Sequence, residues 1–137
     1  MTNSLPVADK LSGIPGVETF LLGGQYLPKQ SALMGGKARR ALGLHRIDLA
    51  FLSAEGADRE GVWNSQEDII AFQLALVAHA ARSVLVIDRT KIGHRAANFL
   101  IRWSEVGLLI SDASPRELRD AGIPSDPPRV LSTQSSP

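Results

Sequence analysis

The sequence predicts an α/β protein in which helices cover both faces of a mostly parallel sheet. Three segments, 47–52, 83–87 and 107–110, are nearly continuous apolar runs, as expected for strands that are buried on both faces. Segments with helical spacing of apolar residues separate these strands. With 137 residues, of which 44% are hydrophobic, the chain is large enough for one domain with a substantial core. The expected architecture is therefore a three-layer sandwich.

The N-terminal third is expected to contain two helices and one strand. Leu5, Ala8 and Leu11 recur at helical spacing before a glycine, and a later β-rich segment ends at Gly23-Gly24. The predicted order is a helix over 4–12 that ends at Gly13, a strand over 17–22, an irregular stretch over 25–35 and a helix over about 35–43.

The remainder alternates strands and helices. The longest helix is predicted over 66–82, where Glu67 and Asp68 favour the positive N-terminal end. Ser114 and Glu117 form a capping box around a proline, which predicts a short helix that ends at Gly122. The other predictions are a strand over 47–52, a small-residue loop over 53–58, strands over 83–87 and 107–110, a strand rather than a helical turn over 96–101, and an edge strand at 130–131.

Composition excludes several classes of function. The net charge is only +1, whereas an autonomous DNA-binding domain usually needs a clustered basic face. The absence of cysteine excludes a disulfide scaffold, a thiolate nucleophile and cysteine-ligated zinc, and it is typical of a cytosolic protein. The three histidines lack metal-ligand spacing, so neither a metal site nor a cofactor is expected. The start of the chain has no signal-peptide pattern, and its apolar runs are too short to span a bilayer.

Polar loops follow the predicted strands, where open α/β sheets bind their ligands. In 88–91, a lysine and a threonine at a strand end are suited to binding an anion; alternatively, Asp88 caps the next turn and Lys91 is solvated. In 53–58, two carboxylates suit sugar hydroxyls or acid–base chemistry, although an ordinary solvated loop has the same composition. The glycine pair at 23–24 is typical of a turn. Packing roles are expected for Trp63 and Trp103, and a solvated helix face for Lys37, Arg39 and Arg40.

Seven short motifs form an ordered series along the chain. They are Thr2–Ala8, Phe20–Gly24, Gly35 before a helix, Asp48–Phe51, Glu55-Gly56 with Gly61, Ile87–Gly93 and Leu109–Asp112. Over residues 2–123 the series resembles the C-terminal effector domain of DeoR-type bacterial transcription regulators. The resemblance implies a fold similar to that of ribose-5-phosphate isomerase. It also implies a cytoplasmic, non-enzymatic oligomer that binds a phosphorylated sugar or polyol, while a separate helix-turn-helix contacts DNA. No membrane partner is implied.

The resemblance also implies roles for particular residues. Thr2 and Asn3 line the pocket near the sugar, and Gly23 and Gly24 border it. The sugar hydroxyls face Glu55, Gly56 and Asp58, whereas Lys91, with Asp88 beside it, contacts the phosphate or other polar groups. On this view residues 1–131 are part of the effector domain and 132–137 are a disordered tail. On the same view, the helix-turn-helix, the family's first strand and its Asp-x-Gly-Thr-Thr-like loop are expected to be absent from this sequence. Ile69–Gln73 stand where the family commonly has a Glu…Lys pattern.

Two alternatives remain. A small sugar-phosphate isomerase or deaminase would use Asp58 or Glu55 as the base and Lys91 as the phosphate or oxyanion partner. A remnant that only oligomerises would have lost its pocket, with interface candidates Phe72, Leu76 and Phe99.

Overall fold

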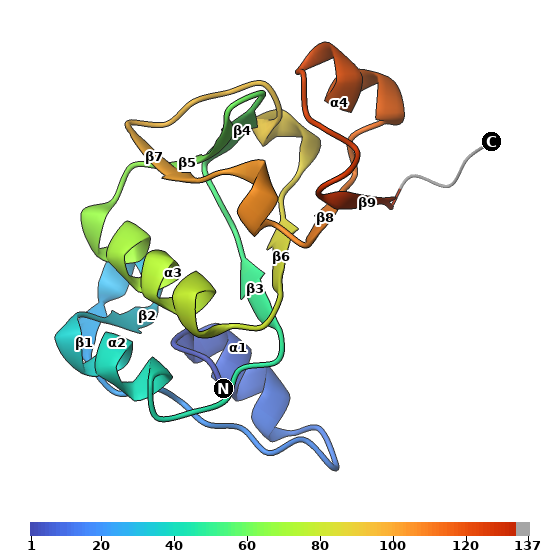
Figure 1. Ribbon diagram of the computed structural model, residues 1–137. Helices are drawn as coiled ribbons and strands as arrows, with labels where there is room; N and C mark the ends of the chain where they lie inside the picture. Colours follow the sequence, from blue (N-terminus) through green and yellow to red (C-terminus); the bar gives the residue numbers. More distant parts are fainter. Residues whose placement is uncertain (134–137) are drawn as a thin grey trace. The chain divides into compact units, whose positions relative to one another are not determined.

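The computed structural model describes residues 1–133. The chain forms two compact units, Met1–Arg46 and the part that begins at Ile47 (Figure 1). The first unit contains α1 (Leu5–Ser12), β1 (Gln25–Leu27), β2 (Ala32–Met34) and α2 (Gly36–Leu42). β1 and β2 pair as an antiparallel hairpin around a 3₁₀ turn.

The two predicted helices of the first unit are confirmed. Gly13 caps the end of α1 and Gly43 caps the end of α2, as the sequence indicates. The strand predicted over 17–22 is wrong, because only Leu21 bridges another segment, at Thr2, and a strand forms only where a partner runs beside it. The irregular stretch predicted over 25–35 is also wrong, since it contains the β1–β2 hairpin.

The second unit contains the parallel sheet. Its elements are β3 (Ala50–Leu52), β4 (Gly56–Asp58), β5 (Gly61–Asn64), α3 (Glu67–His79), β6 (Ser83–Val86), β7 (Asn98–Ile101), β8 (Leu108–Ser111), α4 (Pro115–Asp120) and β9 (Arg129–Ser132). Four strands pair in parallel in the order β3-β6-β8-β9, and β4-β5-β7 form an antiparallel sheet (Figure 1). The predicted α/β class with a parallel sheet is therefore confirmed.

The core of the second unit follows from the register of the parallel strands. Leu52, Leu85 and Leu109 are cross-strand partners, and all three are buried. In a strand, alternate residues face the same side, so these leucines form one apolar row across the sheet. Trp103 and Leu118 bring the segments after β7 and β8 into the same core.

Most predicted elements of this unit are confirmed. The helix over 66–82 is α3, and the strands over 83–87, 96–101, 107–110 and 130–131 correspond to β6, β7, β8 and β9. The strand over 47–52 is shorter than predicted, because Ile47 makes only an isolated bridge to Ala80. The capping box is present: Glu117 N donates to Ser114 Oγ, and Ser114 N donates to the Glu117 carboxylate.

Two features differ from the prediction. The loop expected over 53–58 contains β4, which pairs with the unpredicted β5. The three residues of β4 are all buried, so packing rather than intrinsic strand propensity forms this strand. At the C-terminus, Ser132 belongs to β9 and Thr133 N donates to Ser111 O. The rest of the predicted tail, 134–137, lies outside the described residues.

Candidate functional site

In the second unit, three chain segments converge beyond the carboxyl ends of β3, β6 and β8. These strands are parallel neighbours, so the segments that follow them emerge at the same edge of the sheet. Arg89 N, after β6, donates to Asp112 Oδ1, after β8, at 2.6 Å. Gly93 N donates to Ala57 O at 2.7 Å, which joins the β6 segment to the segment after β3. The sequence predicted this meeting of loops.

The fourth predicted loop, Gly23-Gly24, belongs to the first unit and leads into β1 rather than following a strand.

Asp88 caps the 3₁₀ turn that follows β6. Its Oδ1 accepts hydrogen bonds from Thr90 N, at 3.0 Å, and from Thr90 Oγ1. The hydrogen bond from Thr90 Oγ1, helped by Lys91, holds the pKa of Asp88 below its ordinary value. The capping role that the sequence offered as one alternative is thus present, and Asp88 is an anion at neutral pH.

Lys91 stands at the end of the same turn and is about one-third exposed. Its Nζ lies 3.3 Å from Asp88 Oδ2. An ammonium group has three donor hydrogens, so an ion pair with one carboxylate leaves donors for a second anion. The pair with Asp88 restricts the ammonium group to the edge where the three segments converge. Residues 88–91 can therefore contain the cap formed by Asp88 and also bind an anion through Lys91.

Glu55 precedes β4 and is exposed. One of its carboxylate oxygens, Oε2, accepts a hydrogen bond from Ser65 Oγ. Its backbone N donates to Trp63 O at 3.1 Å. Glu55 is therefore held at both its backbone and its side chain while it faces solvent.

Gly56 is a point of close backbone approach. A Cβ atom there would lie 2.4 Å from His94 O, far inside van der Waals contact. The sequence suggested that small residues here admit a ligand to the backbone, but at Gly56 the approaching group is the chain's own carbonyl. The glycine allows the segment after Lys91 to lie against β4.

Asp58 is the most buried carboxylate of the candidate site, with 7% of the residue exposed. Its Oδ1 accepts from Trp63 Nε1 at 2.9 Å and from the backbone of Glu60 at 2.9 Å. Its Oδ2 pairs with Arg95 Nε at 2.5 Å. Burial alone would raise the pKa of Asp58, but these hydrogen bonds and the guanidinium outweigh it and hold the pKa below the ordinary value. The carboxylate is thus engaged within the chain.

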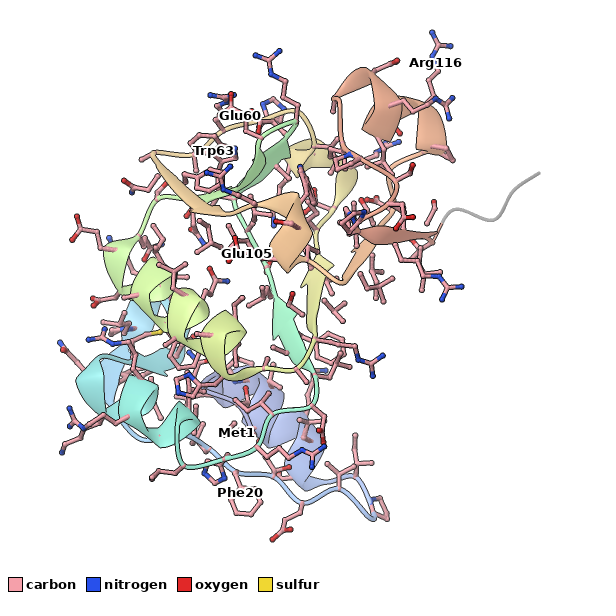
Figure 2. All side chains as sticks on the ribbon, in the orientation of Figure 1. Met1, Phe20, Glu60, Trp63, Glu105 and Arg116 are labelled. Carbon is pink, nitrogen blue, oxygen red and sulfur yellow. The ribbon has the colours of Figure 1, made fainter. Side chains whose placement is uncertain are left out.

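Arg95 is a residue that the sequence reasoning did not find. Its guanidinium lies 4.7 Å from the centre of the Trp63 ring, and its Nη2 pairs with Glu60 Oε1 at 2.6 Å. Figure 2 shows Glu60 and Trp63 close together at the β4–β5 hairpin. Phe99 packs edge-on against the same tryptophan ring. The lone arginine in the segment before β7 gives no local sequence signal, because its partners are 32 or more residues away.

Trp103 has the packing role predicted for it. It is 5% exposed, and its Nε1 donates to Asp58 O at 2.7 Å. The indole therefore fixes the backbone of β4 from the core side, while Arg95 and Trp63 engage the Asp58 side chain.

The remaining predicted residues gather in the first unit. Thr2 exchanges backbone hydrogen bonds with Phe20 and Leu22, and Asn3 Nδ2 donates to Leu33 O at 3.3 Å. Gly24 has φ of +151°, and a Cβ there would lie 2.4 Å from Met34 O. Asn3, near the start of the chain, and Gly24 therefore both lie against β2.

A hollow of about 320 Å³ lies beside Gly24 in the first unit. Its lining comes from the two ends of the hairpin and the start of α2, namely Gly24, Gln25, Met34, Gly35, Gly36 and Lys37. Lys37 was expected on a solvated helix face, and it is exposed, but it also lines this hollow. A glycine-rich wall with one ammonium group is chemically suited to an anionic ligand.

Other features of the described residues place limits on the site. A smaller hollow, about 180 Å³, adjoins the starting residues of β6 and β8, at the sheet edge away from the converging segments. Within residues 1–133, no cluster of three or more His, Asp or Glu side chains is arranged to hold a metal ion. Among the helices of residues 1–133, none combines the length and the apolar composition that a membrane span requires.

Comparison with known proteins gives a consistent family. The family described as the DeoR C terminal sensor domain matches residues 1–113. The chain is 26% identical to the HTH-type transcriptional repressor GlcR of Bacillus subtilis, over 85% of this chain and 45% of that protein. It is 31% identical to the HTH-type transcriptional regulator GlpR of Haloferax volcanii, over 90% of this chain and 50% of that protein.

A third relative is the L-fucose operon activator of Haemophilus influenzae, 27% identical over 83% of this chain and 46% of that protein. The chain thus spans about half the length of the curated relatives it matches.

Proposed function

The chain belongs to the DeoR C-terminal sensor domain family, and from this premise we propose that it binds a phosphorylated sugar or polyol as the effector of a transcription regulator. The observation that carries the proposal is the convergence of three segments at one edge of the parallel sheet, with a held carboxylate, Glu55, and an ammonium group, Lys91. Carboxylates accept hydrogen bonds from sugar hydroxyls, and an ammonium group binds phosphate.

In this proposal the residues divide by chemistry. Lys91, kept in place by Asp88, binds the phosphate, and the Glu55 carboxylate accepts hydrogen bonds from the sugar hydroxyls. Gly56 permits the close packing of the two segments that carry them. Asp58 supports the site by holding Trp63 and Arg95, and both of its oxygens already accept hydrogen bonds within the chain. Within the first unit, Thr2, Asn3, Gly23 and Gly24 stay proposals as ligand-contacting residues, and we add Lys37, because it lines a hollow beside Gly24.

A thermal-shift panel tests this function. Phosphorylated sugars and polyols are compared with their unphosphorylated parents on the wild type, on Lys91→Ala and on the matched control Arg116→Ala, which removes a cation from exposed α4. A ligand at a hundredfold excess over its Kd stabilises the folded state by about 2.7 kcal/mol. We expect a phosphate-dependent shift in the wild type and in Arg116→Ala, and its loss in Lys91→Ala. If no compound at millimolar concentration shifts the melting temperature, the proposal fails.

We further propose that the domain does not catalyse turnover, that it acts in the cytoplasm, and that DNA is contacted only through a separate helix-turn-helix. The relatives are transcription regulators, and the oxygens of Asp58 are occupied by donors, which disfavours Asp58 as a general base. An aldose–ketose interconversion assay is expected to stay at background with millimolar sugar phosphates. Turnover that depends on Glu55 would instead support the isomerase alternative.

Self-association completes the proposal. Phe51, Val86 and Leu131 are 63%, 41% and 51% exposed, and the strand register places all three on one face of the parallel sheet. Parallel sheets are normally covered on both faces, so a second copy is the expected cover. Of the interface candidates from the sequence, Phe72 is buried and Leu76 packs against the core, whereas Phe99 is 40% exposed and also packs on Trp63.

Light scattering coupled to size-exclusion chromatography tests self-association. The wild type is expected to elute as an oligomer. The Phe51→Glu variant is expected to elute with a smaller molar mass than the wild type. The control is Leu44→Glu, which changes a residue that is 82% exposed in the other unit and should leave the mass unchanged. A wild type that remains monomeric at high concentration contradicts this part of the proposal.

A further inference from the structure

Two amide side chains are buried next to the candidate site in the second unit. Asn64, at the end of β5, is 4% exposed, and Gln73, on α3, is 8% exposed. Asn64 Nδ2 donates to Gln73 Oε1 at 3.2 Å, and Gln73 Nε2 donates to Ser53 O at 2.6 Å. Buried amides are destabilising unless they are hydrogen-bonded. The pair therefore constrains the segment after β3, to which one of its hydrogen bonds is made.

The hydrogen bonds continue from Asn64 to Glu55. Asn64 Oδ1 accepts from Ser65 N at 3.0 Å, and Ser65 Oγ donates to Glu55 Oε2. Glu55 follows Ser53 by two residues, so the contacts close a ring with the backbone. We call it the amide ring, and its members are Ser53, Glu55, Asn64, Ser65 and Gln73. An additional hydrogen bond, from Asn98 Nδ2 to Ser65 O at 3.3 Å, joins β7 to the ring.

We propose that the amide ring fixes the Glu55 carboxylate in the position where it accepts hydrogen bonds from hydroxyl groups of the ligand. Gln73 and Asn64 are then positioning residues of the binding site. This inference rests on the proposed function. Within residues 1–133, the only side-chain partner of Glu55 is Ser65, through Oε2, so Oε1 has no protein donor. Oε1 is thus available to a ligand. Holding a flexible side chain before binding lowers the entropy lost when the ligand arrives.

Gln73 is assigned this role because it contacts two segments that are separate in the sequence, one at Ser53 and one at Asn64. Its Nε2 holds Ser53, before Glu55, and its Oε1 holds Asn64, next to the serine that holds the carboxylate. One side chain on the long helix thus fixes both the backbone and, through Asn64 and Ser65, the side chain of Glu55. A leucine at this position would fill similar space but make neither hydrogen bond.

A ligand-free experiment tests whether the ring fixes Glu55. NMR relaxation and scalar couplings of the Glu55 side chain are compared in the wild type, in Gln73→Leu and in the control Val77→Ala. The control removes packing from the same helix without touching the ring. We expect one dominant Glu55 rotamer in the wild type and the control, and several rotamers in Gln73→Leu. A second variant, Gln73→Glu, keeps an acceptor for Asn64 but loses the donor to Ser53, and it should also release Glu55. An unchanged rotamer distribution in both Gln73 variants overturns the proposal.

A binding experiment tests what the fixed carboxylate does. Ribose 5-phosphate, glucose 6-phosphate and inorganic phosphate are titrated into the same proteins by calorimetry. Loss of a hydrogen bond to a charged group weakens binding by about tenfold or more. We expect Gln73→Leu to weaken the binding of a sugar phosphate by about tenfold. The affinity for inorganic phosphate should stay unchanged, since phosphate alone does not contact Glu55. Equal weakening of all probes, or of none, overturns the proposal. If the wild type binds no probe, the proposed function fails, and the rotamer comparison still decides whether the ring fixes Glu55.

Discussion

Replacing Asp58 by alanine is expected to destabilise the folded state strongly, although the residue lies in a polar segment. The carboxylate is nearly fully buried and accepts hydrogen bonds from Trp63 Nε1, from Arg95 Nε and from two backbone amides. The alanine variant would leave these donors without their acceptor. The donors come from the β4–β5 turn, from β5 and from the segment before β7, whereas Asp58 itself belongs to β4, so no local rearrangement satisfies them all.

The magnitude follows from which donors water can reach after the change. A hydrogen bond to a charged group contributes about 1.5–3 kcal/mol. Arg95 and the Glu60 amide can bind water, whereas the Gly61 amide is buried and Trp63 is partly buried. We therefore expect a loss of about 3 kcal/mol in the free energy of unfolding. For a chain of this length that corresponds to a fall of about 10 °C in Tm.

The assay is urea denaturation at pH 7, with Asp120→Ala as the control. Asp120 pairs with Arg116 at 3.6 Å, and both side chains are more than two-thirds exposed, so the control should change stability by less than about 0.5 kcal/mol. An Asp58→Ala protein whose unfolding free energy lies within about 0.5 kcal/mol of the wild type would refute the reasoning.

A pH series gives the sign of the same effect. The pKa of Asp58 is lowered by folding, so the folded state keeps the carboxylate ionised at pH values where the unfolded chain already binds the proton. Its contribution is complete above the ordinary pKa of about 3.9 and is lost as pH falls through the lower folded-state pKa. The difference between wild type and Asp58→Ala should therefore shrink below about pH 4. A difference that grows on acidification would contradict this assignment.

Three further outcomes are expected. Gly56→Ala places a Cβ against His94 O and should cost about 1–3 kcal/mol in urea denaturation; a neutral effect would mean that the two segments separate freely. Ser114→Ala removes the acceptor for Glu117 N and should cost about 1 kcal/mol, with the loss visible as faster amide exchange in α4. Lys91→Ala should change unfolding free energy by no more than about 1 kcal/mol, because its ion pair is partly exposed, so a larger loss would indicate a structural role instead of ligand binding.

The sequence alone was sufficient for the helices and the parallel strands. In α3 and α4, the apolar spacing, the acidic first turn and the capping box act within a few residues of each other. β6 and β8 are short apolar runs, and burial on both faces leaves that composition visible in the sequence. The converging segments after β3, β6 and β8 were predictable for the same reason, since parallel neighbours emerge at one edge.

Only the tertiary structure decided the elements whose stability comes from distant contacts. β1 and β2 are three-residue strands that exist because they pair with each other, whereas the strand-like segment 17–22 has a single bridge partner and forms no strand. β4, with the sequence Gly-Ala-Asp, is a strand because Val62, Ile92 and Trp103 contact its backbone.

The candidate site shows the same division. Local chemistry singled out Glu55, Asp58 and Lys91, because charged residues after a strand are visible in the sequence. It did not show that Asp58 is enclosed by donors, nor that Gln73, on a helix, holds the segment of Glu55. Patterns of neighbouring residues determine secondary structure and the side of the sheet on which loops emerge. Which of those side chains are bonded within the chain and which can bind a ligand depends on contacts that only the fold brings together, such as Gln73 with Ser53 and Arg95 with Asp58, which are 20 and 37 positions apart.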